Sequence, residues 1–129
     1  MRKIFLIFSH ELTEEQKFDL YKNWQVQEFV TLPAYLQALW SNIPPELESL
    51  DVYLTPLFEW LREKALPQDL VLIQGDFGAV YLAVQKAFEL GLVPIYATTS
   101  REVRETKLAD GSIRQERLFK HVRFRVYGR

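Results

Sequence analysis

Short apolar runs alternate along the chain with stretches of helical spacing. The runs at 4–8 and 70–73 are continuously apolar, which is typical of strands buried on both faces of a sheet. Further strands are expected at 28–32 and 93–97. Because helical segments separate these strands, the pattern predicts an α/β fold: a Rossmann-like, mostly parallel sheet with helices on both faces.

Local signals mark where the helices begin. Thr13, with Gln16 three residues later, forms a capping-box sequence. Pro33 is expected at the first position of the next helix. A third helical pattern spans 50–66, and its Pro56 means that the helix either starts at Thr55 or bends. The residues expected to face the core are Phe18, Tyr21 and Trp24 in the first helix and Leu36, Leu39 and Trp40 in the second.

The fourth helix follows the loop 74–78 and ends at Gly91. Its large apolar residues recur at helical spacing, which predicts the buried face: Phe77, Val80, Tyr81, Val84 and Phe88.

The last part of the chain has a different pattern. Asp110-Gly111 predicts a hairpin turn between two polar strands. In the final strand we expect Val122, Phe124 and Val126 on one face and His121, Arg123 and Arg125 on the other. This antiparallel C-terminal element should close the sheet.

Composition indicates one domain over 1–129, with an α/β core at 1–100 and a basic element at 101–129. The chain has no cysteine, which excludes disulfides and thiolate metal sites. A count of two histidines disfavours a zinc site built by the protein, and no metal or cofactor is expected. No apolar run resembles a signal peptide or a membrane span, so a cytoplasmic protein is expected.

The net charge of −1 hides a division along the chain. Residues 1–100 carry 7 Lys/Arg and 13 Asp/Glu, a net charge of −6. Residues 101–129 carry 9 Lys/Arg and 4 Asp/Glu, a net charge of +5. The basic segment favours an anionic partner, although an ordinary solvated hairpin would also explain it.

Polar residues directly follow three of the predicted strands. Ligands of open parallel sheets bind outside the carboxyl ends of the strands, so these loops are candidate binding elements. They comprise Ser9 and His10; Gln74, Gly75, Asp76, Phe77 and Gly78; and Thr98, Thr99, Ser100 and Arg101.

The loop 74–78 opens a helix, where free N–H groups and the helix dipole favour phosphate. Its glycines would either let a ligand approach the backbone or only form a tight turn with Asp76 as helix cap. Neither G-x-G-x-x-G nor a P-loop is present, which disfavours a nicotinamide enzyme.

Acid–base and cationic candidates come from both ends of the chain. His10 and His121 could move a proton, and Arg101 and Lys120 could stabilise negative charge, with Arg123 as a further ligand contact. Asn42, beside the rigid Ile43-Pro44-Pro45 turn, could belong to a lid or a dimer contact.

Five segments resemble small stand-alone CRISPR-associated proteins of the CARF (CRISPR-associated Rossmann fold) superfamily, in the ring-nuclease group of type III systems. In chain order they read I-F-L-I-F-S-H, W-S-N-I-P-P-E, V-L-I-Q-G-D-F-G-A, P-I-Y-A-T-T-S-R and F-K-H-V-R-F-R. The resemblance implies a homodimer that binds cyclic oligoadenylate, in particular cyclic tetra-adenylate, and cleaves it without metal to end the antiviral signal. The positions carried over are Ser9, His10, 75–78, 98–101, Lys120, His121 and Arg123.

Two other functions remain open at this stage. The protein could sense the ring without cutting it. Alternatively, a strand ending in a histidine and a later Gly-Asp-Phe-Gly turn resemble mannose-type phosphotransferase domains, which carry phosphate on that histidine. That group has a double glycine that this chain lacks, and it leaves the basic tail unexplained.

Overall fold

A computed structural model describes residues 2–129. In chain order its elements are β1 (Arg2–Ile7), α1 (Glu14–Trp24), β2 (Val26–Thr31), α2 (Ala34–Ser41), α3 (Thr55–Lys64), β3 (Leu70–Ile73), α4 (Phe77–Glu89), β4 (Val93–Lys107) and β5 (Ile113–Val126). The strands form one sheet in the order β2-β1-β3-β4-β5, with only the β4–β5 pair antiparallel. The predicted α/β fold is confirmed.

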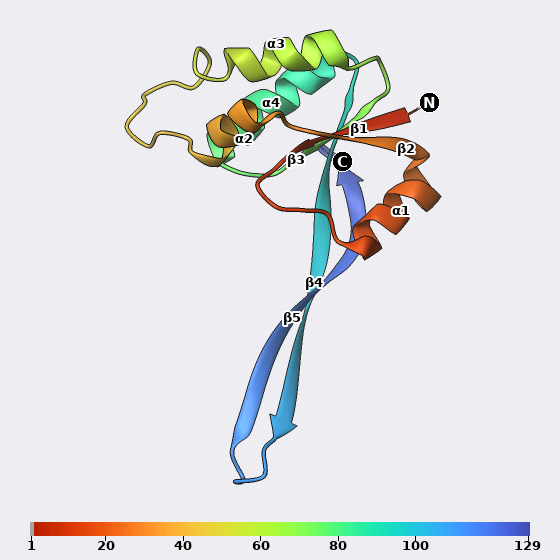
Figure 1. The fold of residues 1–129 in the computed structure, drawn as a ribbon, viewed down its shortest axis with the longest axis vertical. Coiled ribbons are helices and arrows are strands. Elements are labelled where there is room, and N and C mark those ends of the chain that lie inside the picture. The colour runs from red at the N-terminus through yellow and green to blue at the C-terminus, as the bar shows by residue number, and fades with distance from the viewer. Residues whose placement is uncertain (1) are drawn as a thin grey trace.

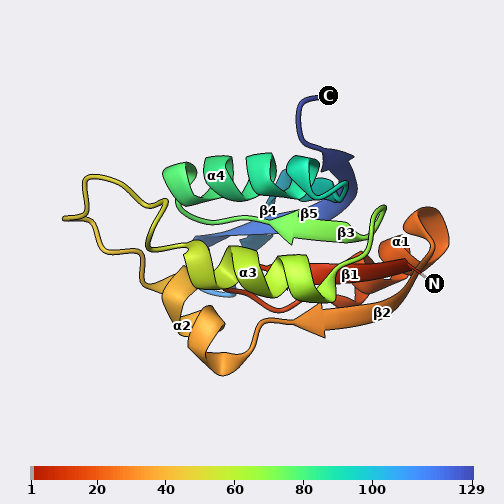
Figure 2. The same ribbon diagram turned by 90° about the horizontal axis from the view of Figure 1, so that it is seen from above.

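The sheet has a helix layer on each face. In Figure 1, α3 and α4 lie above the sheet and α1 lies below it. Side chains alternate accordingly: Phe5 and Ile7 of β1 pack with α2, α3 and α4, whereas Ile4 and Leu6 pack on the α1 side. Figure 2, seen from above, shows β1, β2 and β3 running in the same direction, with the segment 42–54 projecting beyond their ends.

The helix starts follow their local signals. The Thr13 side chain and Gln16 form the expected capping box at α1. The sequence allowed either a helix start at Thr55 or a bend at Pro56. α3 begins at Thr55 with Pro56 in its first turn, so the first alternative is confirmed. Pro33 is the residue before α2 rather than its first residue.

The predicted buried faces of α1 and α4 were largely wrong. In α4 the core side is made by Ala79, Ala83 and Ala87, while Phe77 is 95% exposed. In α1, Leu20 is buried and Phe18 is exposed. Small alanines let α4 approach the sheet closely, so the bulky residues at helical spacing are left on its outer side. The residues predicted inside but found exposed are Phe18, Tyr21, Phe77, Tyr81 and Phe88.

The fourth strand does not end at Ala97 as expected. β4 continues to Lys107 and pairs with β5 along its length, so the segment 98–101 lies within a strand and not in a loop. The two strands form a long hairpin that leaves the body of the molecule on the α1 side (Figure 1). Ser112 hydrogen bonds hold the pKa of Asp110 below its usual value at the hairpin turn.

A bulge near the base of this hairpin changes the expected alternation. The register shifts between Thr98 and Thr99, which pair with Arg123 and His121, so Val122 is the extra residue. As a result His121 lies on the same side as Phe124, with ring centroids 4.8 Å apart, and Val122 is exposed. The prediction that His121 and Phe124 lie on opposite faces of the final strand was therefore wrong.

Candidate functional site

The sheet has a topological switch point between β1 and β3. The chain leaves β1 toward β2 on one side and leaves β3 toward β4 on the other. The crevice between two such strands, at their carboxyl ends, is where open α/β sheets bind ligands. The loops 8–13 and 74–76 flank this crevice, and the Gln74 N–H donates to Ile7 O over 3.1 Å.

Gln74 and Gly75 are fixed by their neighbours. The Trp40 indole Nε1 donates to Gln74 O over 3.0 Å, and Gln74 Oε1 accepts the N–H of Ala97 over 3.0 Å. A Cβ at Gly75 would lie 2.9 Å from Trp40 Nε1. The Gln74 side chain is therefore engaged with the backbone of β4, and Gly75 is needed for close packing against Trp40.

The start of α4 combines N–H groups that attract an anion with a carboxylate that repels one. Asp76 Oδ2 accepts the N–H of Ala79 over 3.0 Å, which is the helix-cap role considered from the sequence. The earlier N–H groups, of Phe77 and Gly78, have no intrahelical acceptor and are left to solvent or a ligand. The Asp76 carboxylate opposes an anion here, so a phosphate would need cations from another element.

The loop after β1 is held by the end of α2. Ser9 Oγ lies 2.9 Å from Ser41 Oγ, and Gln37 Nε2 donates to both Ser41 Oγ and Phe8 O over 3.1 Å. Asn42 is turned back onto its own helix, because its Nδ2 donates to Ala38 O over 2.7 Å. Gln37, Trp40 and Ser41 were not predicted as site residues.

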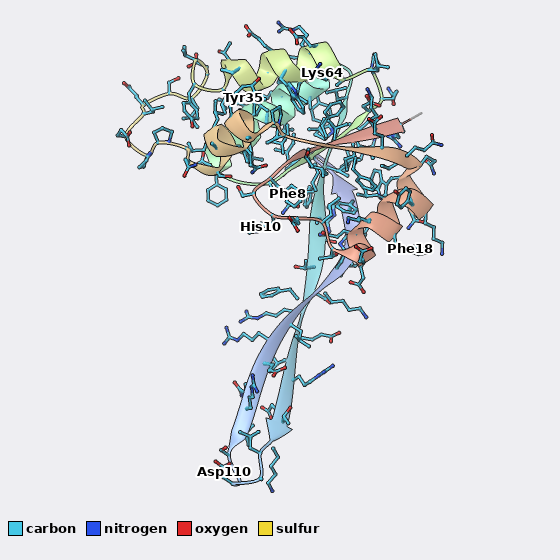
Figure 3. The ribbon with its side chains drawn as sticks, in the orientation of Figure 1. Phe8, His10, Phe18, Tyr35, Lys64 and Asp110 are labelled. Atoms are coloured by element: carbon cyan, nitrogen blue, oxygen red, sulfur yellow. The ribbon has the colours of Figure 1, made fainter. Side chains whose placement is uncertain are left out.

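His10 is exposed at the mouth of a cavity of about 500 Å³ on the α1 side of β1 and β2. Figure 3 shows Phe8 and His10 on the loop below the sheet, near the upper part of the hairpin. Apolar rings line the cavity, and polar groups surround them, an arrangement typical of small-molecule sites. The lining includes Phe8, Lys17, Tyr21, Phe29, Thr31 and Gln37.

The base of the hairpin brings the two basic candidate segments together. Thr98 pairs with Arg123, Ser100 with Lys120 and Arg101 with Phe119. Thr98 Oγ1 donates to Arg123 O over 2.8 Å and accepts the Arg123 N–H over 3.2 Å. These two segments therefore lie side by side because their strands pair.

His121 does not face the carboxyl-end loops. Its side chain is only 7% exposed, and its Nε2 lies 2.7 Å from Asp19 Oδ2 of α1. The other ring nitrogen, Nδ1, is buried and has no hydrogen-bond partner among residues 2–129. His121 therefore attaches the hairpin base to α1, and a ligand would reach it only after rearrangement.

Comparison with known proteins places the chain in a family. A family model described as "Uncharacterized protein MJ1673 family" matches residues 2–125. The chain belongs to the MJ1673 family. The MJ1673 protein of Methanocaldococcus jannaschii is 52% identical over 127 residues, which cover 98% of each chain. No solved structure matches.

The described part of this MJ1673-family chain contains neither a cluster of metal-binding side chains nor a helix that could span a membrane. Among residues 2–129, no three His, Cys, Asp or Glu side chains gather as a metal site would require. Over the same residues, no helix has the length and apolar character needed to cross a membrane.

Proposed function

We propose that this protein binds cyclic oligoadenylate, in particular cyclic tetra-adenylate, at the carboxyl edge of its sheet and cleaves it to linear products. One observation carries the proposal: hydrogen bonds link all five segments that resemble ring nucleases. Ser9 contacts Ser41, Trp40 bonds to Gln74, Gln74 bonds to Ala97, and Thr98 bonds to Arg123. Residues far apart in the sequence are thus joined by one continuous series of hydrogen bonds.

The proposed cleavage uses the substrate's own 2′-hydroxyl. The 2′-oxygen attacks the adjacent phosphorus, the bond from phosphorus to the 5′-oxygen breaks, and the leaving oxygen takes up a proton. The products are a 2′,3′-cyclic phosphate and a 5′-hydroxyl. Holding the hydroxyl in line with the scissile bond supplies much of the rate, so neither a metal nor a strong nucleophile is required.

Exposure favours His10 over His121 as the residue that takes the proton. His10 is exposed beside Ser9, whereas His121 is buried against Asp19. Arg101 and Lys120 on the exposed hairpin are the proposed stabilisers of charge on the phosphoryl oxygens. A two-fold symmetric ring on a homodimer would use each residue twice. Such a signal acts in the cytoplasm, which is the proposed location.

A non-cutting sensor is the second candidate, and the surroundings of His10 favour it. The His10 ring is exposed and lies beside the Phe8 ring, with 6.4 Å between ring centroids, and among residues 2–129 no hydrogen bond orients it. General bases in enzymes are usually oriented by a hydrogen bond to a second group. A sensor needs the same binding surface without that orientation.

The deciding experiment incubates the protein with radiolabelled cyclic tetra-adenylate in EDTA and separates the products by thin-layer chromatography. Conversion to linear di-adenylate with a cyclic phosphate end is expected, and His10→Ala should slow it about 10²–10⁴-fold with binding retained. Arg101→Ala should also slow it, whereas Arg114→Ala is the matched control, because Arg114 lies near the hairpin tip and pairs with Glu116.

The other outcomes are equally informative. An intact ring that still shifts the protein on a native gel would identify the sensor. A ring that is neither bound nor cut would overturn the proposal, and equal rates for wild type and His10→Ala would remove His10 from the mechanism.

A further inference from the structure

The hairpin formed by β4 and β5 carries apolar side chains that no other part of residues 2–129 covers. Isolated two-stranded ribbons are at best marginally stable in water, so exposed apolar residues on one indicate a partner. Phe119 is 70% exposed and Val103 is 59% exposed. The other large apolar side chains exposed there are Leu108, Ile113, Leu118 and Val122.

Strand pairing places several of these residues on one face with arginines. Arg101 pairs with Phe119 and Val103 with Arg117, and directly paired residues of an antiparallel ribbon share a face. The next pair along this face is Glu105 with Gln115. The face therefore combines an apolar centre with two guanidinium groups, and we call it the Phe119 face.

The Phe119 face suits a protein better than a nucleic acid. Of the four carboxylates of this segment, Glu105 lies on the Phe119 face itself, Glu102 and Glu116 lie on the opposite face, and Asp110 lies at the turn. Carboxylates at these positions would repel a polyanion, whereas a protein surface with acidic groups and apolar side chains can match both features.

The body of this chain offers such a surface. A groove of about 450 Å³ lies between the segment 43–50 and the first turns of α4, and the carboxylates of Glu48 and Asp76 line it. No Lys or Arg occurs between Lys22 and Arg62, a stretch with five carboxylates. The apolar walls are Pro44, Pro45, Leu47, Leu50, Tyr81 and Leu82.

We propose that the hairpin of one copy docks into this groove of a second copy, and reciprocally, with Phe119 in the groove and Arg117 beside Glu48. The observation that selects a second copy is charge complementarity: Arg101 and Arg117 lie on the Phe119 face, whereas the groove lining contains Glu48 and Asp76 and no Lys or Arg. A reciprocal contact also forms a closed two-fold dimer. The inference goes beyond the proposed function, since it holds whatever ligand the sheet edge binds.

Sedimentation equilibrium tests this at micromolar concentration. Wild type should be a dimer, and Phe119→Ala should raise the dissociation constant at least tenfold. Phe18→Ala is the matched control, because Phe18 is 65% exposed on α1 and belongs neither to the Phe119 face nor to the groove lining. Circular dichroism should show that both variants keep the fold.

A charge exchange tests the docking geometry itself. Arg117→Glu and Glu48→Lys should each be monomeric, because each homodimer would pair like charges twice. An equimolar mixture should dimerise again, since in the mixed dimer one interface pairs the two introduced charges and the other pairs the native Arg117 with the native Glu48.

Three results would overturn the inference. Wild type could remain monomeric at 100 µM, a dimer could persist unchanged in Phe119→Ala, or the mixture could fail to recover. Loss of single-stranded RNA binding in Arg117→Glu, with a monomeric wild type, would assign the hairpin to nucleic acid instead. Ring binding and cleavage are measured separately, so failure here is distinguishable from failure of the proposed function.

Discussion

At the scale of single residues, the two glycines of the loop 74–78 have different roles. A Cβ at Gly75 would lie 2.9 Å from the Trp40 indole nitrogen, inside normal contact distance. A Cβ at Gly78 would meet its nearest atom, Asp76 Oδ2, at 3.5 Å, an ordinary van der Waals distance. Packing therefore explains Gly75, whereas nothing in the packing requires Gly78.

We accordingly predict opposite outcomes for two neighbouring substitutions. Gly75→Ala should lower the free energy of unfolding by about 1–3 kcal/mol, because the added methyl group displaces Trp40. Gly78→Ala should leave it unchanged or raise it slightly, since alanine favours the helix. Urea denaturation followed by tryptophan fluorescence measures both, and equal effects of the two substitutions would contradict this assignment.

Some site residues were predictable and others were not, for a physical reason. Ser9, His10 and Gln74 follow apolar strands directly, and that local pattern places them at the sheet edge. Gln37 and Ser41 reach the same edge from within α2. Their role depends on how that helix packs, and no feature of the neighbouring sequence indicates it.

At the scale of elements, a buried hydrogen bond helps to hold the hairpin base against α1. Asp19 Oδ2 lies 2.7 Å from His121 Nε2, with the two side chains 15% and 7% exposed. Apart from strand pairing, this contact and the packing around Phe124 determine where the hairpin leaves the body.

Asp19→Ala should therefore destabilise the fold by about 1.5–3 kcal/mol, the usual range for a hydrogen bond that involves a charged group. The substitution should also speed hydrogen exchange of the backbone amides at 119–123, and it should do so more than in the strands at the sheet centre. Glu63→Ala, an exposed carboxylate on α3, is the control and should change stability by less than about 0.5 kcal/mol. Similar losses for both variants would mean that the contact contributes little.

Sequence patterns identified most elements but misjudged the long hairpin. The buried strands β1 and β3 are continuous apolar runs, and the α1 capping box is local, so both were recognisable. β4 was expected to end at Ala97 because its apolar pattern stops there. From Arg101 onward the strand is exposed on both faces, so its polar residues follow no burial pattern that could mark a strand.

At the scale of the whole molecule, the chain consists of an acidic α/β body and a basic ribbon that extends from it (Figure 1). The body presents the carboxyl edge of the sheet, with Ser9 and the turn at Gln74, next to the point where the ribbon leaves. Ligand binding and self-association would thus occupy neighbouring surfaces. The Asp76 carboxylate disfavours phosphate at this edge, and cations from a second copy could approach it there and offset that repulsion.

The absence of Lys and Arg between Lys22 and Arg62 has a practical consequence for proteolysis. Trypsin cleaves after these residues, so it cannot cut 23–61, whereas the exposed ribbon offers it many sites. Brief digestion should remove the ribbon first and leave a body fragment visible by mass spectrometry. Clipping should slow as protein concentration rises if copies shelter each other's ribbons, and a rate independent of concentration would indicate that the ribbon stays free.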